Sequence, residues 1–461
     1  MRGWGWRHPG RVAWALRGVD LRIDAGERVL LLGASGAGKS TLLLALAGLL
    51  DRSGGGDYEG DLSVHGPAGL VLQDPETQLV MARAGDDVAF GLENHCVPTP
   101  EMWPRVHRAL ADVGFPYSED RATAALSGGE KQRLAIAGIL ALRPRVLLID
   151  EPTANLDPDG ARAIRDVIAR IADRRDVTVL IVEHRVAEVL PLIDRVVVIE
   201  AGGGIIADGS PETVFAREDA RLRRLGVWVP GDAPTAPPRR PAVADEAIVA
   251  RDLAYRYPRG EAPALRGVDA TVSRGRALAI TGPNGSGKST LAMLLAGLLK
   301  PQSGTVRAFG EPPWRWPARV LVGRIGTVFQ DPEHQLVAGR VDDELRVGPR
   351  ALGLRSADIE RRVRELLERL GLSGLAAANP FTLSGGEKRR LSVGTALATS
   401  PEAVLLDEPT FGQDRRTFGE LLALLSEYRD RGGAIAFASH DQHFVDAFAD
   451  DRLRLDAGRV A

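Results

Sequence analysis

The chain has 461 residues, and its hydrophobic fraction of 44% is enough to build ordinary cores in two or three domains. Its formal net charge of −2 provides no overall positive field, which argues against nucleic acid as a partner. The single cysteine excludes an internal disulfide framework, and no apolar stretch approaches the length that crosses a bilayer. We therefore expect a soluble chain from a reducing compartment.

Taken in chain order, each half of the sequence predicts a strand, a glycine-rich loop and a helix, followed by a helical insert and further strands. Continuous apolar runs at 29–32, 146–149 and 179–182 suit strands that are buried on both faces. This pattern predicts the α/β fold class, with a parallel sheet at the centre of each domain. Helical patterning over about 80–126 and 338–383 predicts a helical subdomain in each half.

A proline-rich segment at 228–246 separates the two halves and is expected to be an extended linker. The predicted domains are therefore residues 1–227 and 247–461. The second domain opens with the strand-like run AIVARDLAYRY, whereas the first leaves no room for an equivalent, so we expect the natural chain to begin upstream of Met1. The second half also ends sooner, and we expect it to lack most of the tail that closes the first half.

The strongest signal in the sequence is an internal repeat. Two glycine-rich loops, GASGAGKST and GPNGSGKST, are each followed by a glutamine, the motif LSGGE, an apolar strand ending in DEP, and a histidine. These features lie at 33–41, 73, 126–130, 147–152 and 184 in the first copy, and at 282–290, 330, 383–387, 404–409 and 440 in the second. A repeat of this length indicates two whole domains, each with its own nucleotide site.

The pattern G-x-x-x-x-G-K-[ST] predicts a loop whose backbone N–H groups surround phosphate oxygens at the N-terminus of a helix. We expect Lys39 and Lys288 to reach the β- and γ-phosphates of ATP, and Ser40 and Ser289 to offer a hydroxyl to Mg²⁺. The loop residues predicted to bind nucleotide are Gly33, Ser35, Gly36, Gly38, Lys39, Ser40 and Thr41, and Gly282, Asn284, Gly285, Gly287, Lys288, Ser289 and Thr290.

An acidic pair follows the predicted strand before each DEP proline. Asp150 and Asp407 should lie at strand ends near the loops, where they could hold Mg²⁺ through water. Glu151 and Glu408 come next and could act as general bases on the attacking water. An isolated Asp-Glu pair is usually surface charge, but its place after a buried strand favours catalysis here.

The LSGGE motif resembles the signature of ATP-binding-cassette (ABC) ATPases, and the resemblance covers nearly the whole chain. It implies two tandem P-loop NTPase domains in which the signature of one domain closes on nucleotide held by the other, pairing Lys39 with Ser384 and Lys288 with Ser127. His184 and His440 match the switch histidine that contacts the γ-phosphate. The other positions that the resemblance assigns are Gln73 and Gln330 (nucleotide and metal), Gly128, Gly129, Gly385 and Gly386 (signature), and Asp157 and Asp414 (D-loop).

An aromatic side chain near the start of each domain should stack on adenine. Tyr257 is the expected stacking residue in the second domain, with Tyr255 two positions before it. His8 and Trp6 are the corresponding residues of the first domain, and either of them could stack or simply pack.

The segments QDPETQLV and QDPEHQLV resemble those of energy-coupling factor ATPases, which drive importers of vitamins and transition-metal ions. The resemblance implies that Gln78 and Gln335 begin the region that touches a membrane partner, and that the protein sits peripherally on the cytoplasmic face of the membrane. The expected partners are a transmembrane coupling protein and a substrate-binding membrane protein. Because both copies keep the lysine, the glutamate, the histidine and LSGGE, we expect two hydrolytically competent sites, although TANLD in the first copy becomes TFGQD in the second.

Two alternatives remain open. A tandem ATPase of a sugar importer is the nearest, although the second copy of such proteins is typically degenerate and this one is intact. A ribosome-associated translation factor would have a long, charged, helical linker, whereas the segment here is short and rich in proline. Nothing in the sequence identifies the cargo, because in such systems a separate membrane protein selects it.

Overall fold

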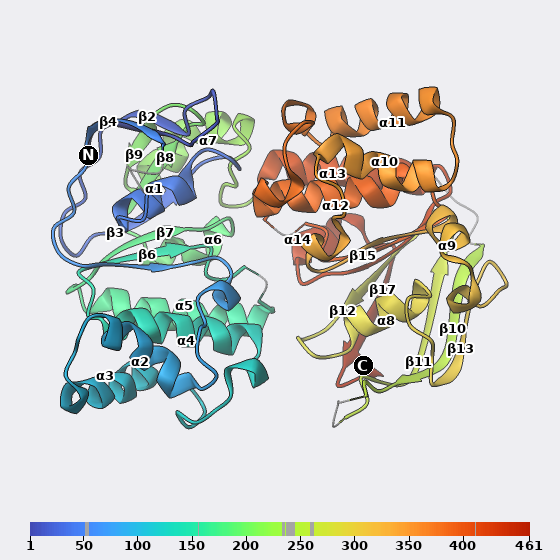
Figure 1. Ribbon diagram of the computed structural model, residues 1–461, viewed down its shortest axis with the longest axis horizontal. Coiled ribbons are helices and arrows are strands. Elements are labelled where there is room, and N and C mark those ends of the chain that lie inside the picture. The colour runs from blue at the N-terminus through green and yellow to red at the C-terminus, as the bar shows by residue number, and fades with distance from the viewer. Residues whose placement is uncertain (51–54, 155, 233–235, 237–244, 259–261, 411) are drawn as a thin grey trace. The chain divides into compact units, whose positions relative to one another are not determined.

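The computed structural model describes residues 1–50, 55–154, 156–232, 236, 245–258, 262–410 and 412–461 (Figure 1). The chain folds into two compact units, Met1–Asp232 with Asp414–Arg416, and Ala233–Gln413 with Thr417–Ala461. The predicted linker falls where the first unit gives way to the second, although most of its prolines lie outside the described residues. Within the described part of the chain, no helix is both long and apolar enough to span a membrane.

The first unit is built around a six-stranded sheet, as the buried apolar runs predict. In spatial order its strands are β5 (Ala68–Val71), β6 (Val146–Asp150), β7 (Thr178–Val182), β3 (Arg28–Leu32), β8 (Arg195–Ile199) and β9 (Ile205–Gly209). All neighbours pair in parallel except β8 and β9. The carboxyl ends of β3, β6 and β7 therefore meet at one edge of the sheet, and the chain segments that leave them carry the candidate site.

Helices cover this sheet, and the predicted helical subdomain is present. The helices of the first unit are α1 (Lys39–Leu46), α2 (Ala84–Asn94), α3 (Thr99–Asp112), α4 (Gly128–Ala141), α5 (Pro158–Asp173), α6 (Val186–Val189) and α7 (Pro211–Arg224), with short 3₁₀ turns at Pro75–Thr77, Thr123–Ala125 and Leu190–Leu192. Helices α2 and α3 pack on α4 and form the subdomain between the first glutamine and the DEP strand.

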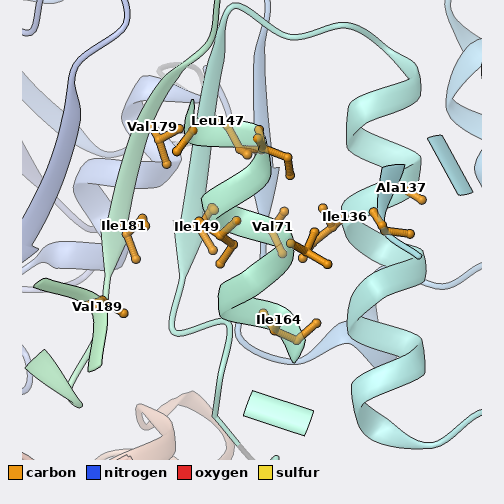
Figure 2. Close-up of a cluster of buried hydrophobic side chains, with 14 of the residues drawn as sticks. Val71, Ile136, Ala137, Leu147, Ile149, Ile164, Val179, Ile181 and Val189 are labelled. Carbon is orange, nitrogen blue, oxygen red and sulfur yellow. The ribbon is translucent and has the colours of Figure 1, made fainter. Parts of the chain in front are cut away.

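The core of the first unit lies between the sheet and the helices α4 and α5. Val71 and Ile149 of the sheet face Ile136 of α4 and Ile164 of α5 (Figure 2), and all four side chains are at most 1% exposed. Burying a side chain of this size is worth roughly 1.5–3 kcal/mol. The strand ends that carry the functional residues therefore rest on a closely packed support.

The second unit repeats this architecture. Its sheet has the order β14 (Ile325–Val328), β15 (Ala403–Asp407), β16 (Ala434–Ala438), β12 (Ala277–Thr281), β17 (Asp451–Asp456) and β18 (Arg459–Val460). Its helices are α8 (Lys288–Leu295), α9 (Ala318–Arg324), α10 (Val341–Ala351), α11 (Ser356–Arg369), α12 (Gly385–Ala398), α13 (Arg415–Asp430) and α14 (Gln442–Phe448), with 3₁₀ turns at Pro313–Arg315, Pro332–Gln335, Ser373–Leu375 and Pro380–Thr382. Helix α9 accounts for the extra length of the second copy before its glutamine.

The ends of the repeats differ from two expectations. The first unit does have part of the opening strand, because β1 (Arg2–Arg7) pairs with β2 (Leu16–Val19) and β4 (Asp57–Asp61), although β1 is shorter than its counterpart in the second unit. In the second unit, β10 (Glu246–Tyr255) pairs in the same way with β11 (Leu265–Ser273) and β13 (Ser303–Ala308). The tail of the second half keeps a helix and two strands, α14, β17 and β18, and differs from the first mainly by the helix α7.

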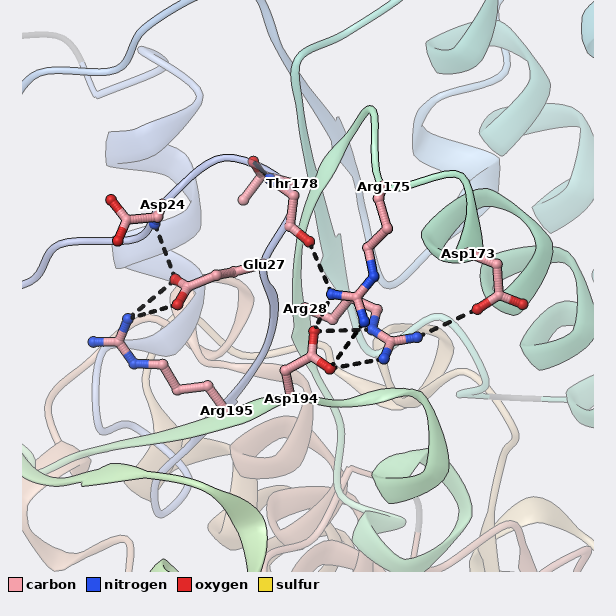
Figure 3. A network of polar contacts seen from close by, with 9 residues as sticks. Asp24, Glu27, Arg28, Asp173, Arg175, Thr178, Asp194 and Arg195 are labelled. Atoms are coloured by element: carbon pink, nitrogen blue, oxygen red, sulfur yellow. Dashed lines mark hydrogen bonds and ion pairs between the residues drawn. The ribbon is translucent and has the colours of Figure 1, made fainter.

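Charged side chains tie together the starts of the strands in the first unit, at the end of the sheet away from the glycine-rich loop (Figure 3). Arg28 at the start of β3 and Arg175 after α5 both bind Asp194, at 2.7 and 2.6 Å. Hydrogen bonds from Arg28 and Arg175 hold the pKa of Asp194 well below its usual range. Beside them Arg195 of β8 pairs with Glu27 at 3.1 Å.

Candidate active sites

The lysines of the two glycine-rich loops make the same contacts in the two units. The Lys39 ammonium is buried and donates to the carbonyl oxygens of Gly33 and Ala34 at 2.9 and 3.0 Å. Lys288 donates to those of Gly282 and Pro283 at the same distances. Both loops thus hold a lysine ammonium over their own backbone, ahead of the first turn of a helix.

Glycine is required where each loop turns into its helix. Gly38 and Gly287 occupy the N-cap positions of α1 and α8 with φ values of 92° and 102°, in the left-handed region. A Cβ atom on Gly287 would lie 2.5 Å from the carbonyl oxygen of Ala264. Only glycine lets the backbone pass this point, which leaves the N–H groups at the helix start free to face a phosphate. Gly36 and Gly285 have φ values of 76° and 75°, so the backbone at this position is the same in both loops.

The serine and the aspartate among the predicted metal ligands come together at the end of the DEP strand in each unit. Ser40 hydrogen-bonds the Asp150 carboxylate, and Ser289 does the same to Asp407. Burial, with the charge of Glu151 next in size, raises the pKa of Asp150 to about 6, and burial also raises the pKa of Asp407. A hydroxyl and a carboxylate in contact are hard oxygen donors of the kind that Mg²⁺ takes together with substrate phosphates, so these residues fit that ion.

The two glutamates share an unusual backbone. Glu151 and Glu408 have φ values of 45° and 50°, in the left-handed region that non-glycine residues rarely adopt. Each donates its N–H to the neighbouring strand, Glu151 to Val182 and Glu408 to Ala438, at 2.9 Å. The strained geometry at the same position in both units indicates a function that needs the carboxylate turned out of the sheet.

In the first unit Glu151 is held by two of the predicted site residues. Its carboxylate accepts a hydrogen bond from the Gln73 amide at 2.8 Å and pairs with the His184 imidazole at 2.9 Å. Burial opposes the charged forms of both groups, but their mutual attraction outweighs it, lowering the pKa of Glu151 and raising that of His184. The structure therefore brings Gln73, Glu151 and His184 into direct contact.

In the second unit the same residue types are arranged differently. The Glu408 carboxylate accepts from the Ser439 hydroxyl at 3.2 Å and from the backbone N–H of His440 at 3.1 Å. The His440 ring contacts the Asn284 side chain at 2.8 Å and lies 3.7 Å from Glu408. Burial, with Asp407 beside it, raises the pKa of Glu408 to about 7. Gln330 is held through its backbone carbonyl by Arg389.

The glutamate of each QDPE segment forms an ion pair with the lysine that follows LSGGE. Lys131 binds Glu76, and Lys388 binds Glu333. The chain has few lysines among its 59 basic residues, and this pairing gives a physical reason for keeping one at these positions. Sequence reasoning missed this pairing, in which the glutamates come from the segment next to the glutamine.

Sequence reasoning also missed a carboxylate that binds the backbone just after each of these segments. Asp87 in the first turn of α2 accepts from the N–H groups of Val80 and Met81 at 2.7 and 2.8 Å. Glu344 of α10 accepts from those of Val337 and Ala338 at 2.9 and 2.6 Å. A carboxylate thus holds the loop after Gln78, and another the loop after Gln335, by accepting two backbone N–H groups in each case. The two glutamines themselves differ: Gln78 bonds the backbone of Leu70 and Leu72, and Gln335 bonds α12.

The signature motif begins a helix in both units. Ser127 caps α4 and Ser384 caps α12, and the glutamate of LSGGE completes a capping box by accepting the serine N–H at 2.8 Å in each case. Gly128, Gly129, Gly385 and Gly386 form the first turns. The spacing S-x-x-E is itself the signal from which this role of Glu130 and Glu387 could have been predicted. The D-loop residue Asp157 caps α5 by accepting from Gly160 at 2.7 Å, while Asp414 is buried directly before α13.

The aromatic residues near the domain starts occupy matching places. Tyr257 lies 3.2 Å from the Thr290 hydroxyl, and His8 lies 3.1 Å from that of Thr41, so each borders its own glycine-rich loop. The Tyr257 ring is 39% exposed and open to a ligand. Trp6 is only 4% exposed and belongs to the core, which leaves His8 as the accessible ring of the first unit.

Each unit therefore has a phosphate loop between a strand of a mainly parallel sheet and a helix, an acidic strand end with a histidine beside it, and a capped signature helix. This combination defines a P-loop nucleoside triphosphatase. The family model for ABC transporters matches residues 16–154 and 265–411, and the chain belongs to that family of ATP-hydrolysing transport ATPases.

Similar proteins agree with this assignment. The provisionally named HMP/thiamine import ATP-binding protein YkoD of Bacillus subtilis is 34% identical over 95% of this chain and 86% of its own length. A provisionally named ABC transporter ATP-binding protein of Methanosarcina mazei is 34% identical over 98% of this chain and 86% of its own. A solved complex of an archaeal ribosome recycling factor, aABCE1, matches 99% of this chain and 89% of its own with a TM-score of 0.66, but at 21% identity it shows the fold alone.

Proposed function

We propose that the chain is the energy-coupling subunit of an importer of the energy-coupling factor type, acting at the cytoplasmic face of the membrane on a vitamin or a transition-metal ion. The observation that carries the proposal is the pair of segments QDPETQLV and QDPEHQLV. In both units the glutamate of the QDPE segment pairs with the lysine after LSGGE, and a carboxylate binds the backbone of the loop that follows. The name of the YkoD relative, which refers to import of HMP and thiamine, supports a vitamin or its precursor as the class of cargo.

The surface offered to a membrane partner is the loop that follows Gln78 in the first unit and Gln335 in the second. Val80 is 62% exposed and Val337 is 73% exposed, although both lie in segments whose backbone is firmly bonded. An apolar side chain held outward on a fixed loop suits insertion against an apolar helix of a transmembrane coupling protein. A second membrane protein would then bind the cargo.

The proposed cycle uses both sites. ATP binding by Lys39 and Lys288 draws the two cassettes together, with Ser384 and Ser127 each completing the site of the other cassette. Glu151 and Glu408 then orient and deprotonate the attacking water, and His184 and His440 hold the γ-phosphate. Mg²⁺, held by the serine hydroxyls, the aspartates and the glutamine oxygens, would supply charge neutralisation at the phosphates. Loss of the γ-phosphate contacts reopens the pair and moves the membrane partner.

The test is a pull-down from native membranes with the E151Q/E408Q double variant in the presence of ATP, with partners identified by mass spectrometry. Removing both proposed bases should hold the ATP-bound state and stabilise partner binding. Recovery of small polytopic membrane proteins without a soluble sugar-binding protein is the expected result. Recovery of a sugar-import complex would instead favour the sugar-importer alternative, and recovery of ribosomal proteins alone would exclude the transport proposal.

The docking surface has a separate test within the same experiment. Val80→Asp and Val337→Asp place a charge on the proposed apolar contact and should reduce partner recovery about tenfold when combined. Val12→Asp is the matched control, because Val12 is 92% exposed and lies away from both glutamine segments in the sequence. Unchanged recovery with the combined variant would contradict the proposed docking site while leaving the ATPase function intact.

A further inference from the structure

The residue directly before the switch histidine differs between the two units. Glu183 precedes His184 at the end of β7, whereas Ser439 precedes His440 at the end of β16. Glu183 is only 5% exposed, and a buried carboxylate needs several hydrogen bonds to be tolerated. None of the roles proposed above uses this residue.

Glu183 obtains those hydrogen bonds from two loops. One of its oxygens accepts from the N–H of Thr153 at 3.2 Å and from the Thr153 hydroxyl. The other accepts from the N–H groups of His184 at 2.9 Å and Arg185 at 3.4 Å. Because Thr153 follows Glu151 by two residues, Glu183 fastens the loop that carries the proposed base to the loop that carries the switch histidine.

In the second unit, a carboxylate at a different position connects the two corresponding loops. Thr410, the equivalent of Thr153, donates its hydroxyl to Asp441 at 3.0 Å. Asp441 follows the histidine, at the position that Arg185 occupies in the first unit. Its own N–H is accepted by the Ser439 hydroxyl oxygen at 3.0 Å. The acid has thus moved from one side of the histidine to the other.

This exchange is accompanied by a different position of the histidine ring. In the first unit Glu183 takes the backbone N–H of His184, and the imidazole pairs with Glu151 at 2.9 Å. In the second unit no carboxylate precedes the histidine, so Glu408 takes the N–H of His440 and the imidazole turns to Asn284 at 2.8 Å. The two units therefore differ both in the side chain at the preceding position and in the arrangement of the same catalytic pair.

We propose that Glu183 is a positioning residue that holds His184 on Glu151 and thereby makes the first cassette the slower of the two hydrolytic sites. The inference rests on the roles proposed above for the glutamates and the switch histidines. It keeps both sites competent and makes them unequal.

The physical reason is the contact that must be broken before reaction. To orient water and meet a γ-phosphate, Glu151 and His184 have to leave each other, which costs a charge-assisted hydrogen bond. Glu408 is held by a hydroxyl and a backbone N–H, and the His440 ring lies 3.7 Å from it, with the neutral side chain of Asn284 nearer at 2.8 Å. The second site therefore needs the smaller rearrangement.

The experiment measures steady-state ATP hydrolysis by the purified full chain, one site at a time. The E408Q background reports the first site and the E151Q background reports the second, while the double variant sets the zero. In the E408Q background, E183S/R185D gives the first unit the residues that flank the histidine of the second unit. In the E151Q background, S439E/D441R gives the second unit those of the first. E183Q, which keeps the size of the side chain but removes its charge, is the conservative variant.

The expected result is a pair of opposite changes in kcat. E183S/R185D should raise kcat of the first site about fivefold, and S439E/D441R should lower kcat of the second by a similar factor, the scale of one charge-assisted hydrogen bond. KM should stay within about twofold, because none of the exchanged residues contacts the phosphate loop. E183Q should raise kcat in the same direction as the exchange, by a smaller factor.

A purely structural role for Glu183 predicts something else, namely a fall in kcat at the first site for every variant. That outcome, or an unchanged kcat in both exchanges, would overturn the proposal. If the first-site exchange fails to fold, the reciprocal exchange at Ser439 decides the matter alone. Activity that survives in the E151Q/E408Q zero would instead contradict the roles of the glutamates, so the two failures can be told apart.

Discussion

The lysines of the two phosphate loops have matching partners, whereas the histidines that follow β7 and β16 do not. Lys39 and Lys288 donate to matching carbonyls at matching distances, but His184 and His440 have different partners. The comparison teaches where duplicated cassettes can diverge. Binding a triphosphate demands one backbone geometry, while the switch region tolerates a carboxylate on either side of the histidine.

The largest expected effect is on nucleotide binding, for which the lysines of the two phosphate loops have the same contacts. Lys39→Ala and Lys288→Ala should each weaken nucleotide binding at their own site roughly a hundredfold or more, because each removes a buried cation aimed at phosphates. Equilibrium titration with a fluorescent ATP analogue should then report one remaining site in either variant. Lys300→Ala is the control, since that ammonium lies over the Trp314 ring, 5.0 Å from its centroid. Full binding in either loop variant would show that the two loops are not equivalent.

The next effect is on stability. It concerns an ion pair at equivalent positions of the two units, in which the acidic and the basic residue have exchanged places. Glu27 pairs with Arg195 in the first unit, and Arg276 pairs with Asp451 through two hydrogen bonds of 2.7 and 2.6 Å in the second. Arg276→Glu should destabilise the second unit by about 1–2 kcal/mol, because it sets like charges together.

Adding Asp451→Arg to that variant recreates the order of charges found in the first unit and should restore most of the loss. Urea unfolding of the full chain at low and moderate salt provides the measurement, and the effect should shrink as salt rises. If the double variant is no more stable than the single one, the two ion pairs are not interchangeable.

A smaller effect, on partner-stimulated ATP hydrolysis, is expected at an ion pair that the two units share, Glu76–Lys131 and Glu333–Lys388. These pairs connect the proposed docking segments to the signature helices. Glu76→Gln and Glu333→Gln together should lower partner-stimulated ATP hydrolysis about fivefold while changing the basal rate less than twofold. Glu93→Gln, an exposed glutamate of α2, is the control. An equal fall in both rates would show that the pairs serve catalysis and not coupling.

The smallest effect is a dependence of stability on pH in the first unit. Because hydrogen bonds from Arg28 and Arg175 hold the pKa of Asp194 below its usual range, the unfolded chain takes up this proton first as pH falls. The stabilisation is complete above the ordinary carboxyl pKa of about 4 and is lost progressively below it. At pH 7 Asp194→Asn should cost about 1 kcal/mol, since the pair is partly exposed and screened.

The measurement compares unfolding midpoints of the wild type and Asp194→Asn between pH 7 and pH 3. The difference between the two unfolding midpoints should become smaller as pH falls. A difference that grows would mean that folding raises the pKa of Asp194 and does not lower it. Arg28→Lys keeps one positive charge without the planar fork and should reproduce part of the loss at pH 7.

Much of the architecture followed from the sequence, because its signals are local or periodic. Apolar runs such as 179–182 predicted buried parallel strands, and helical patterning predicted the subdomains. The short strand β1 was missed because six residues with two glycines give little periodicity, and it forms only by pairing with β2 and β4. For Trp6 and His8 the sequence left two candidates, and burial separated them.

The sequence by itself determined which chemistry is present: two phosphate loops, two acidic strand ends, two signatures and two histidines, each readable from residue types at fixed spacing. Only the tertiary structure decided how they contact one another. Glu183 and Thr153 are thirty positions apart and meet because β6 and β7 are neighbours in the sheet. Whether a switch histidine rests on a glutamate or on an asparagine depends on such contacts between strand ends, and no local pattern encodes them.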